Sequence, residues 1–335
     1  MADQAAAEAA AETAPPPSRS ATLLLAAVCA TLVAGILAAS GPGGTDFDYF
    51  WTAATALIHG RDPYRAVAES GIGYPLFYPL PAVLVVAPLG LLPLWAARLA
   101  FAWAGTFALS LAAFRYGRGL PAVLFSASFL SALMQGQWSP LLTPGAVVPW
   151  LGALWVTKPS IGLALAVAYP SRRAAIGAAV LVAASLVVMP AWPAAWLQSL
   201  RATNHLILAL QPGGVLLLLS LLRWRRPEAR LLAAFACVPQ TPALYETIPL
   251  FLIPRTRWGG YLLAALSLLA TGYMRTVMPL GPGMRIEESL TRRWPIMFWC
   301  MYLPALIMVL LPVLEERFGA RLRGRLARRP ASTSS

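Results

Sequence analysis

The sequence has few charged residues. They make up 12% of the 335 residues, about half of the roughly 25% that is usual in soluble domains. Hydrophobic residues make up 59%, and the mean hydropathy is +0.66. A soluble globule could not hide so much apolar surface. The composition therefore excludes a soluble enzyme, a disordered chain and a disulfide scaffold, and it predicts a helical membrane protein with several spans.

Histidine and cysteine are also scarce. Cys29, Cys237 and Cys300 all lie in apolar segments, and none has a neighbour at metal-ligand spacing. They are predicted to be small buried hydrophobic residues without a disulfide framework. His59 and His205 are the only histidines, so a histidine-rich metal site is excluded.

Lysine is almost absent, because Lys158 is the one lysine among 26 basic residues. The arginines cluster between apolar runs, for example at 172–173, 223–226 and 317–329. This pattern is typical of cytoplasmic loops that orient a helix bundle and contact anionic lipids. The net charge of +13 therefore indicates membrane lipids, and not nucleic acid, as the partner.

Three regions are expected along the chain. Residues 1–20 are predicted to be a disordered cytoplasmic tail, 21–314 a transmembrane domain, and 315–335 a basic cytoplasmic tail. The apolar run at 21–39 is either a signal peptide or a retained first helix, and its length favours the helix. Residues 41–75 then form a long first extracytoplasmic loop.

The later apolar runs are short and rich in proline. They lie at 76–93, 95–114, 120–134, 138–157, 159–170, 174–190, 206–222, 230–254, 259–279 and 295–314. Several fall below the about 20 residues that a spanning helix needs, and proline occurs 30 times. The expected fold is thus an all-α bundle with several broken or re-entrant helices around a cavity. The high content of Ala, Arg, Gly and Pro with almost no lysine indicates a GC-rich bacterial gene. Together with the apolar runs, this predicts a multi-pass protein of the bacterial inner or plasma membrane.

Acidic residues are concentrated in the first loop. The loop contains Asp46, Asp48, Asp62 and Glu69. Carboxylates gathered on the extracytoplasmic side favour general-base chemistry there. The alternative is that Asp46 only caps a short amphipathic helix near 50–59. Glu246 stands in an apolar stretch, where a charge costs about 2.5–3.5 kcal/mol at mid-bilayer. It is therefore predicted to face a polar cavity.

Several short motifs follow one another along the chain. They are Asp46-Phe47 with Gly60 to Tyr64, Tyr78-Pro79, Gly136-Gln137, Lys158-Pro159, and Pro239-Gln240 with Tyr245. In this order they resemble glycosyltransferase family 87, whose members are GT-C-type membrane enzymes that use polyprenyl-phosphate sugars and include mannosyltransferases.

The resemblance implies a GT-C bundle and an inverting transfer on the extracytoplasmic face. The sugar, mannose or another hexose or pentose, would pass from a polyprenyl-phosphate donor to a lipid or envelope glycan. Asp46 would be the catalytic base and Asp48 its backup. The lipid phosphate leaves as an anion, so one carboxylate suffices. No cofactor is expected, and the alternative is a weakly held divalent ion at Asp46 and Asp48.

The donor phosphate needs a cation, for which Lys158 is the first candidate. The alternative is a lysine that reaches toward the membrane interface, with Arg201 and His205 as rival phosphate ligands. Tyr245 and Glu246, in the late element of the resemblance, are assigned to substrate binding. Glu246 is a departure from the family pattern.

Two further groups of residues are candidate sugar contacts. Tyr64, Tyr74 and Tyr78 either stack on sugar faces or belong to an interfacial aromatic belt. Gln137 and Gln240 either bond sugar hydroxyls or join helices by hydrogen bonds.

Two other function classes remain open. A transporter or lipid flippase would show internal repeats with matching broken helices, and the sequence has no convincing repeat. A non-catalytic membrane relative is the third class. Nucleotide-sugar or ATP use has no support, because neither a Walker motif nor a dinucleotide-binding glycine motif is present.

Overall fold

A computed structural model of the chain describes residues 18–41, 45–72, 74–201, 205–241, 243–278 and 286–311. Most of the predicted tail 1–20 and all of 315–335 lie outside the described residues. Within the described ranges the chain is helical and has no strand, and Leu206 and Gln240 form one isolated antiparallel bridge. The all-α prediction is confirmed.

The first half of the chain is divided into many short helices. They are α2 (Arg19–Ser40), α3 (Thr45–Ile58), α4 (Pro63–Glu69), α5 (Leu80–Val86), the 3₁₀ helix η1 (Ala87–Leu91), α6 (Leu94–Tyr116), η2 (Leu120–Phe125), α7 (Ala127–Gln135), α8 (Ser139–Leu142), η3 (Thr143–Ala146) and η4 (Pro149–Thr157). Only α2 and α6 exceed 20 residues in this half of the described chain.

The second half continues in the same way. Its elements are α9 (Pro159–Ala168), α10 (Arg172–Val188), α11 (Trp192–Leu200), η5 (Leu208–Leu210), η6 (Gly214–Arg223), α12 (Pro227–Cys237), η7 (Leu244–Leu252), α13 (Arg257–Thr276), α14 (Ile286–Met297) and the π-helical turn η8 (Phe298–Tyr302). Helix continues from η8 to Leu311.

Proline explains why many of these helices begin where they do. α4 begins at Pro63, which follows the cap Asp62, and α9 begins at Pro159. Proline fits the first turn of a helix because its missing N–H would have no partner there. The same residue breaks the long apolar runs of the sequence into short helices.

Three helices in the described ranges are long and apolar enough to cross a membrane: Arg19–Ser40, Leu94–Tyr116 and Thr291–Leu311. A fourth span is possible if α10 and α11, which meet at an angle of 101°, count as one. The expectation of broken segments is met at this bend. α2 packs against α6, where Trp103 Nε1 donates to Thr31 Oγ1 at 3.2 Å.

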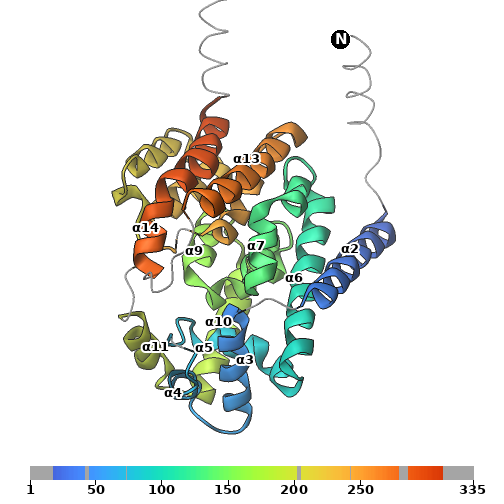
Figure 1. The fold of residues 1–335 in the computed structure, drawn as a ribbon, viewed down its shortest axis with the longest axis vertical. Helices are drawn as coiled ribbons and strands as arrows, with labels where there is room; N and C mark the ends of the chain where they lie inside the picture. The colour runs from blue at the N-terminus through green and yellow to red at the C-terminus, as the bar shows by residue number, and fades with distance from the viewer. Residues whose placement is uncertain are drawn as a thin grey trace, which may run out of the picture.

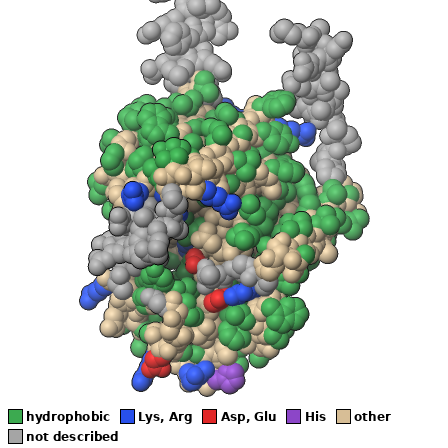
Figure 2. Space-filling model, viewed as in Figure 1, with side chains coloured by type: hydrophobic (Ala, Val, Ile, Leu, Met, Phe, Trp, Pro, Cys, Tyr) green, Lys and Arg blue, Asp and Glu red, His purple; other side chains and the backbone are tan. Residues whose placement is uncertain are grey.

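The loop helices gather at one end of the molecule. In Figure 1, α3, α4 and α11 lie at the lower end, whereas α13 and the helix that leads to Leu311 lie at the upper end. Hydrophobic side chains cover most of the face seen in Figure 2, and the visible Asp and Glu side chains lie in its lower half.

α3 is held in place by an aromatic core. Phe47, Phe50 and Trp138 are fully buried, and the ring of Phe50 meets those of Tyr78 and Trp138 edge-on at 4.3 and 5.6 Å. Such edge-to-face contacts add to the stabilisation from burial. They fix the first turn of α3 against the centre of the bundle, beside α7.

Candidate functional site

Asp46 lies in the first turn of α3. The helix begins at Thr45, five residues before the predicted start near residue 50, so Asp46 lies inside the helix and is not its N-cap. Its carboxylate instead accepts a hydrogen bond at Oδ2 from the side-chain amide of Gln137. The capping interpretation of Asp46 is therefore wrong, although its charge suits a helix N-terminus.

Gly136 brings Gln137 to Asp46. It ends α7 in the left-handed conformation, with φ at +61°, a region that favours glycine. A Cβ at this position would lie 2.5 Å from the Cβ of Phe47, which is closer than two carbon atoms can pack. The missing side chain thus allows α3 to approach the end of α7.

Lys158 is the cation of this site. It precedes α9 and is only 8% exposed. Its Nζ donates to Gln137 Oε1 at 3.0 Å and lies 2.9 Å from Glu246 Oε1. Glu246, on η7, is 1% exposed. The sequence predicted that Glu246 faces a polar cavity; its described polar contact is instead this ion pair with Lys158.

Two tyrosine rings enclose the Lys158 ammonium. Its Nζ lies 4.7 Å from the ring centroid of Tyr245 and 5.7 Å from that of Tyr78, within the range of cation–π attraction. The Tyr78 hydroxyl also donates to Gln137 Oε1 at 3.4 Å. Tyr64 holds the backbone at Tyr78 in place, because its hydroxyl donates to the Tyr78 carbonyl at 3.1 Å.

The surroundings of Asp46 act on its pKa in both directions. Burial raises the pKa of this carboxyl and is the largest effect, while the Lys158 charge and the Gln137 hydrogen bond lower it and Asp48 raises it. The pKa of Asp46 remains above its ordinary value. Burial likewise raises the pKa of the neighbouring Tyr49 to about 12. A carboxylate with a raised pKa is a stronger base, which suits proton abstraction.

Asp48, the predicted backup base, has a partner of its own. Arg98 on α6 donates through Nε to Oδ1 at 2.9 Å and through a terminal nitrogen to Oδ2 at 2.6 Å. This two-point contact uses both carboxylate oxygens and fastens α3 to α6. A divalent ion shared by Asp46 and Asp48 would compete with Arg98. No group of three His, Cys, Asp or Glu side chains suited to a metal occurs among the described residues.

The cluster consists of Asp46, Gln137, Lys158, Glu246, Tyr78 and Tyr245. Three other predicted residues have their described contacts outside it. Tyr74 is exposed, with its ring 6.4 Å from that of Tyr49. Arg201 is the exposed C-cap of α11. The ring of His205 meets that of Phe77 edge-on at 6.4 Å.

Gln240 is buried and has local contacts. Its side-chain amide donates at 3.0 Å to the carbonyl of Phe235, in the preceding helix α12 (Pro227–Cys237), and its backbone pairs with Leu206. Its Oε1 has no hydrogen-bond partner among the described residues, so neither the sugar-contact nor the helix-joining interpretation of Gln240 is decided, whereas Gln137 lies with Asp46 and Lys158.

Arg98 was not among the predicted site residues. It stands alone in the apolar run 95–114, and a single charge in such a run is a signal for a buried partner. Tyr78 was predicted as a sugar-stacking or interfacial aromatic, and its contact with Lys158 was missed because nothing local shows which way its ring points.

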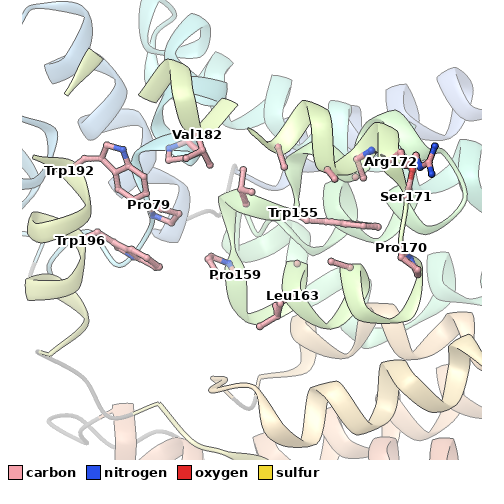
Figure 3. A pocket seen from close by; sticks show the side chains of 18 residues that line it. Pro79, Trp155, Pro159, Leu163, Pro170, Ser171, Arg172, Val182, Trp192 and Trp196 are labelled. Atoms are coloured by element: carbon pink, nitrogen blue, oxygen red, sulfur yellow. Dashed lines mark hydrogen bonds between the residues drawn. The ribbon is translucent and has the colours of Figure 1, made fainter. Parts of the chain in front are cut away.

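A large apolar cavity adjoins the cluster. It has a volume of about 710 Å³ and lies between η4, α9, α10 and α11. Figure 3 shows Pro79, Trp192 and Trp196 on one side and Trp155 and Arg172 on the other. Pro79 and Pro159, which directly follow Tyr78 and Lys158 in the chain, both line it.

A search of known protein families, of curated proteins and of solved structures finds no match to this chain. The functional argument therefore depends on the geometry of the site and on the sequence motifs.

Proposed function

We propose that this protein is a membrane glycosyltransferase that moves a sugar from a polyprenyl-phosphate donor to a lipid or glycan acceptor. One observation carries the proposal. The motifs around Asp46, Gln137, Lys158 and Tyr245 are far apart in the sequence, and their side chains meet in one largely buried cluster. The same motifs carry the resemblance to glycosyltransferase family 87.

The proposed chemistry is a single displacement with Asp46 as base. Asp46 accepts the proton of the acceptor hydroxyl, whose oxygen attacks the anomeric carbon and forms the new glycosidic bond. The bond from that carbon to the phosphate oxygen breaks, and polyprenyl phosphate leaves with its electron pair as an anion. No acid is needed for a leaving group that is stable as an anion, and attack from the opposite face inverts the configuration.

The apolar cavity supports a lipid-linked donor. Its lining is dominated by prolines, tryptophans and small apolar residues, and its volume lies in the usual range of ligand pockets. A hydrocarbon chain in this cavity would end beside Tyr78 and Lys158. The donor phosphate would then lie within reach of the Lys158 ammonium.

The proposal is tested with the purified full-length protein in lipid nanodiscs. Radiolabelled polyprenyl-phosphate mannose and a membrane-lipid extract are supplied, and transfer into the acceptor fraction is measured. We expect the wild type to transfer the sugar and Asp46→Asn to have lost this transfer. Transfer that is undiminished in Asp46→Asn would show that Asp46 is not the base.

A second candidate is a lipid transporter or flippase. The observation that favours it is the buried Lys158–Glu246 ion pair, since ionisable pairs inside helix bundles commonly mark transport pathways. Proteoliposomes separate the two candidates: a flippase moves a fluorescent lipid phosphate between leaflets without forming a glycoside, and a transferase forms the glycoside.

A further inference from the structure

Lys158 lies between two carboxylates but contacts only one of them directly. Its Nζ is 2.9 Å from Glu246 Oε1, whereas the amide of Gln137 stands between Lys158 and Asp46. Gln137 accepts from Lys158 through Oε1 and donates to Asp46 through Nε2. Lys158, the one buried cation among the described residues, thus pairs directly with Glu246 on η7 and only through Gln137 with Asp46 on α3.

Glu246 has no visible task other than this ion pair. Its side chain is 1% exposed, and Oε2 has no hydrogen-bond partner among the described residues. A buried carboxylate is unfavourable unless a partner neutralises it. A role that depends on its charge would explain why an acid occupies this position.

We propose that Glu246 is a positioning residue, which holds the Lys158 ammonium in an ion pair so that Asp46 receives an amide hydrogen bond instead of the full cation. The role of Asp46 as a base rests on the proposed function, but the coupling of Glu246 to Asp46 does not. Without the charge of Glu246, the field of Lys158 acts on Asp46 undiminished. Asp46 then holds its negative charge more firmly and becomes a weaker base.

Other ionisable groups also act on Asp46 and are left unchanged in the test. They are Asp48 and Tyr49 on α3, Tyr78, and Tyr245 beside Glu246. Asp48 is itself neutralised by Arg98. Lys158 is therefore the cation whose influence on Asp46 depends on Glu246.

The test measures the protonation of Asp46 directly and needs no substrate. Dicyclohexylcarbodiimide modifies carboxyl groups in their protonated form, and mass spectrometry of the peptide that contains Asp46 gives the labelled fraction. The full-length protein in nanodiscs is labelled over a range of pH values, as wild type, Glu246→Gln and Lys158→Met. We expect Glu246→Gln to lower the labelling midpoint by about one pH unit, and Lys158→Met to raise it.

The double variant Lys158→Met with Glu246→Gln shows whether Glu246 acts through Lys158. The proposed effect of Glu246 on Asp46 needs the Lys158 charge, so the midpoint of the double variant should match that of Lys158→Met. An unchanged or raised midpoint in folded Glu246→Gln would overturn the positioning role. If Glu246→Gln does not fold, a double-variant midpoint clearly below that of Lys158→Met would overturn the role equally, because Glu246 would then act on Asp46 by direct repulsion.

The transfer assay separates this inference from the proposed function. Shifted midpoints in a protein that transfers no sugar would support the coupling and refute the transferase. Sugar transfer together with unmoved midpoints would support the transferase and refute the positioning role.

Discussion

Gln137 connects Asp46 to Lys158 without letting the two charges touch. Its amide nitrogen donates to Asp46 Oδ2, and its carbonyl oxygen accepts from Lys158 Nζ at 3.0 Å. An amide can do this because it is a donor at one end and an acceptor at the other. The carboxylate is therefore oriented by the cation and yet remains available for a proton.

The first prediction concerns Asp46. Asp46→Asn keeps the shape of the side chain but removes the base, so transfer should fall by at least about 10²-fold, the typical contribution of a positioned base. Donor binding should be retained. Transfer rates and donor affinity are measured in nanodiscs, with Asp48→Asn as the matched control two residues away.

Asp48→Asn should reduce transfer less, because Asp48 contacts Arg98 and not Gln137. An inactive Asp48→Asn beside an active Asp46→Asn would move the base to Asp48. The pH profile offers a second check: the base is the carboxylate, and burial raises the pKa of Asp46. Transfer should therefore fall on acidification with a midpoint above the ordinary value of about 3.9.

The second prediction concerns the stability of the Lys158–Glu246 pair. Lys158→Met leaves Glu246 buried without a counter-ion, which should lower the free energy of unfolding by about 3–5 kcal/mol. Adding Glu246→Gln removes the stranded charge and should restore much of this loss. Thermal unfolding in one detergent measures both variants. A double variant no more stable than the single one would show that the pair is not coupled.

The third prediction tests the close approach at Gly136. Alanine there would be strained at a φ of +61° and would collide with Phe47, which displaces the first turn of α3. A displacement of about 1 Å can cost about 10²-fold in rate, so transfer by Gly136→Ala should fall strongly. Gly272→Ala is the control, because a Cβ there meets no atom within 4 Å; its activity should equal that of the wild type.

The fourth prediction concerns the apolar cavity. Ala178 lines it, whereas the next residue, Ala179, is exposed and does not. Ala178→Phe should raise the KM for long-chain polyprenyl-phosphate donors and leave that for a short-chain donor nearly unchanged. Ala179→Phe should change neither. Equal effects of the two substitutions would place the donor chain elsewhere.

The fifth prediction concerns topology. The arginine distribution predicts that both ends of the chain lie in the cytoplasm and that residues 41–75 lie outside. In a variant without native cysteines, Ser70→Cys, at the exposed end of α4, should react with a membrane-impermeant maleimide in intact cells. Ser335→Cys should react only after lysis. The reverse labelling pattern would invert the orientation.

The short helices, the unusual position of Glu246 and two of the site motifs could be predicted from the sequence, each for a different physical reason. The apolar runs and the prolines predict short helices, because both act locally. Glu246 could be marked as unusual, since a lone acid in an apolar stretch needs a partner. The Gly136-Gln137 and Lys158-Pro159 motifs could be singled out through their order in the chain.

The pairings themselves could not be predicted. Asp46 meets Gln137 and Asp48 meets Arg98 across long sequence separations, which tertiary packing alone decides. The early start of α3 at Thr45 was also missed, because the polar and aromatic residues 46–51 have little intrinsic helix preference. Their aromatic rings pack into the bundle, and this packing extends the helix.

The packing of α2 on α6 has a consequence for how the protein is made. The two helices are separated in the chain by residues 41–93. During synthesis α2 would enter the bilayer first and would remain there without α6 until α6 is made. The exposed leucines of α2, such as Leu24 and Leu32, which are 66% and 63% exposed, would keep it stable in hydrocarbon during that interval. Thr31 and Trp103 then meet only when α6 is inserted, so the order of translation is also the order of assembly.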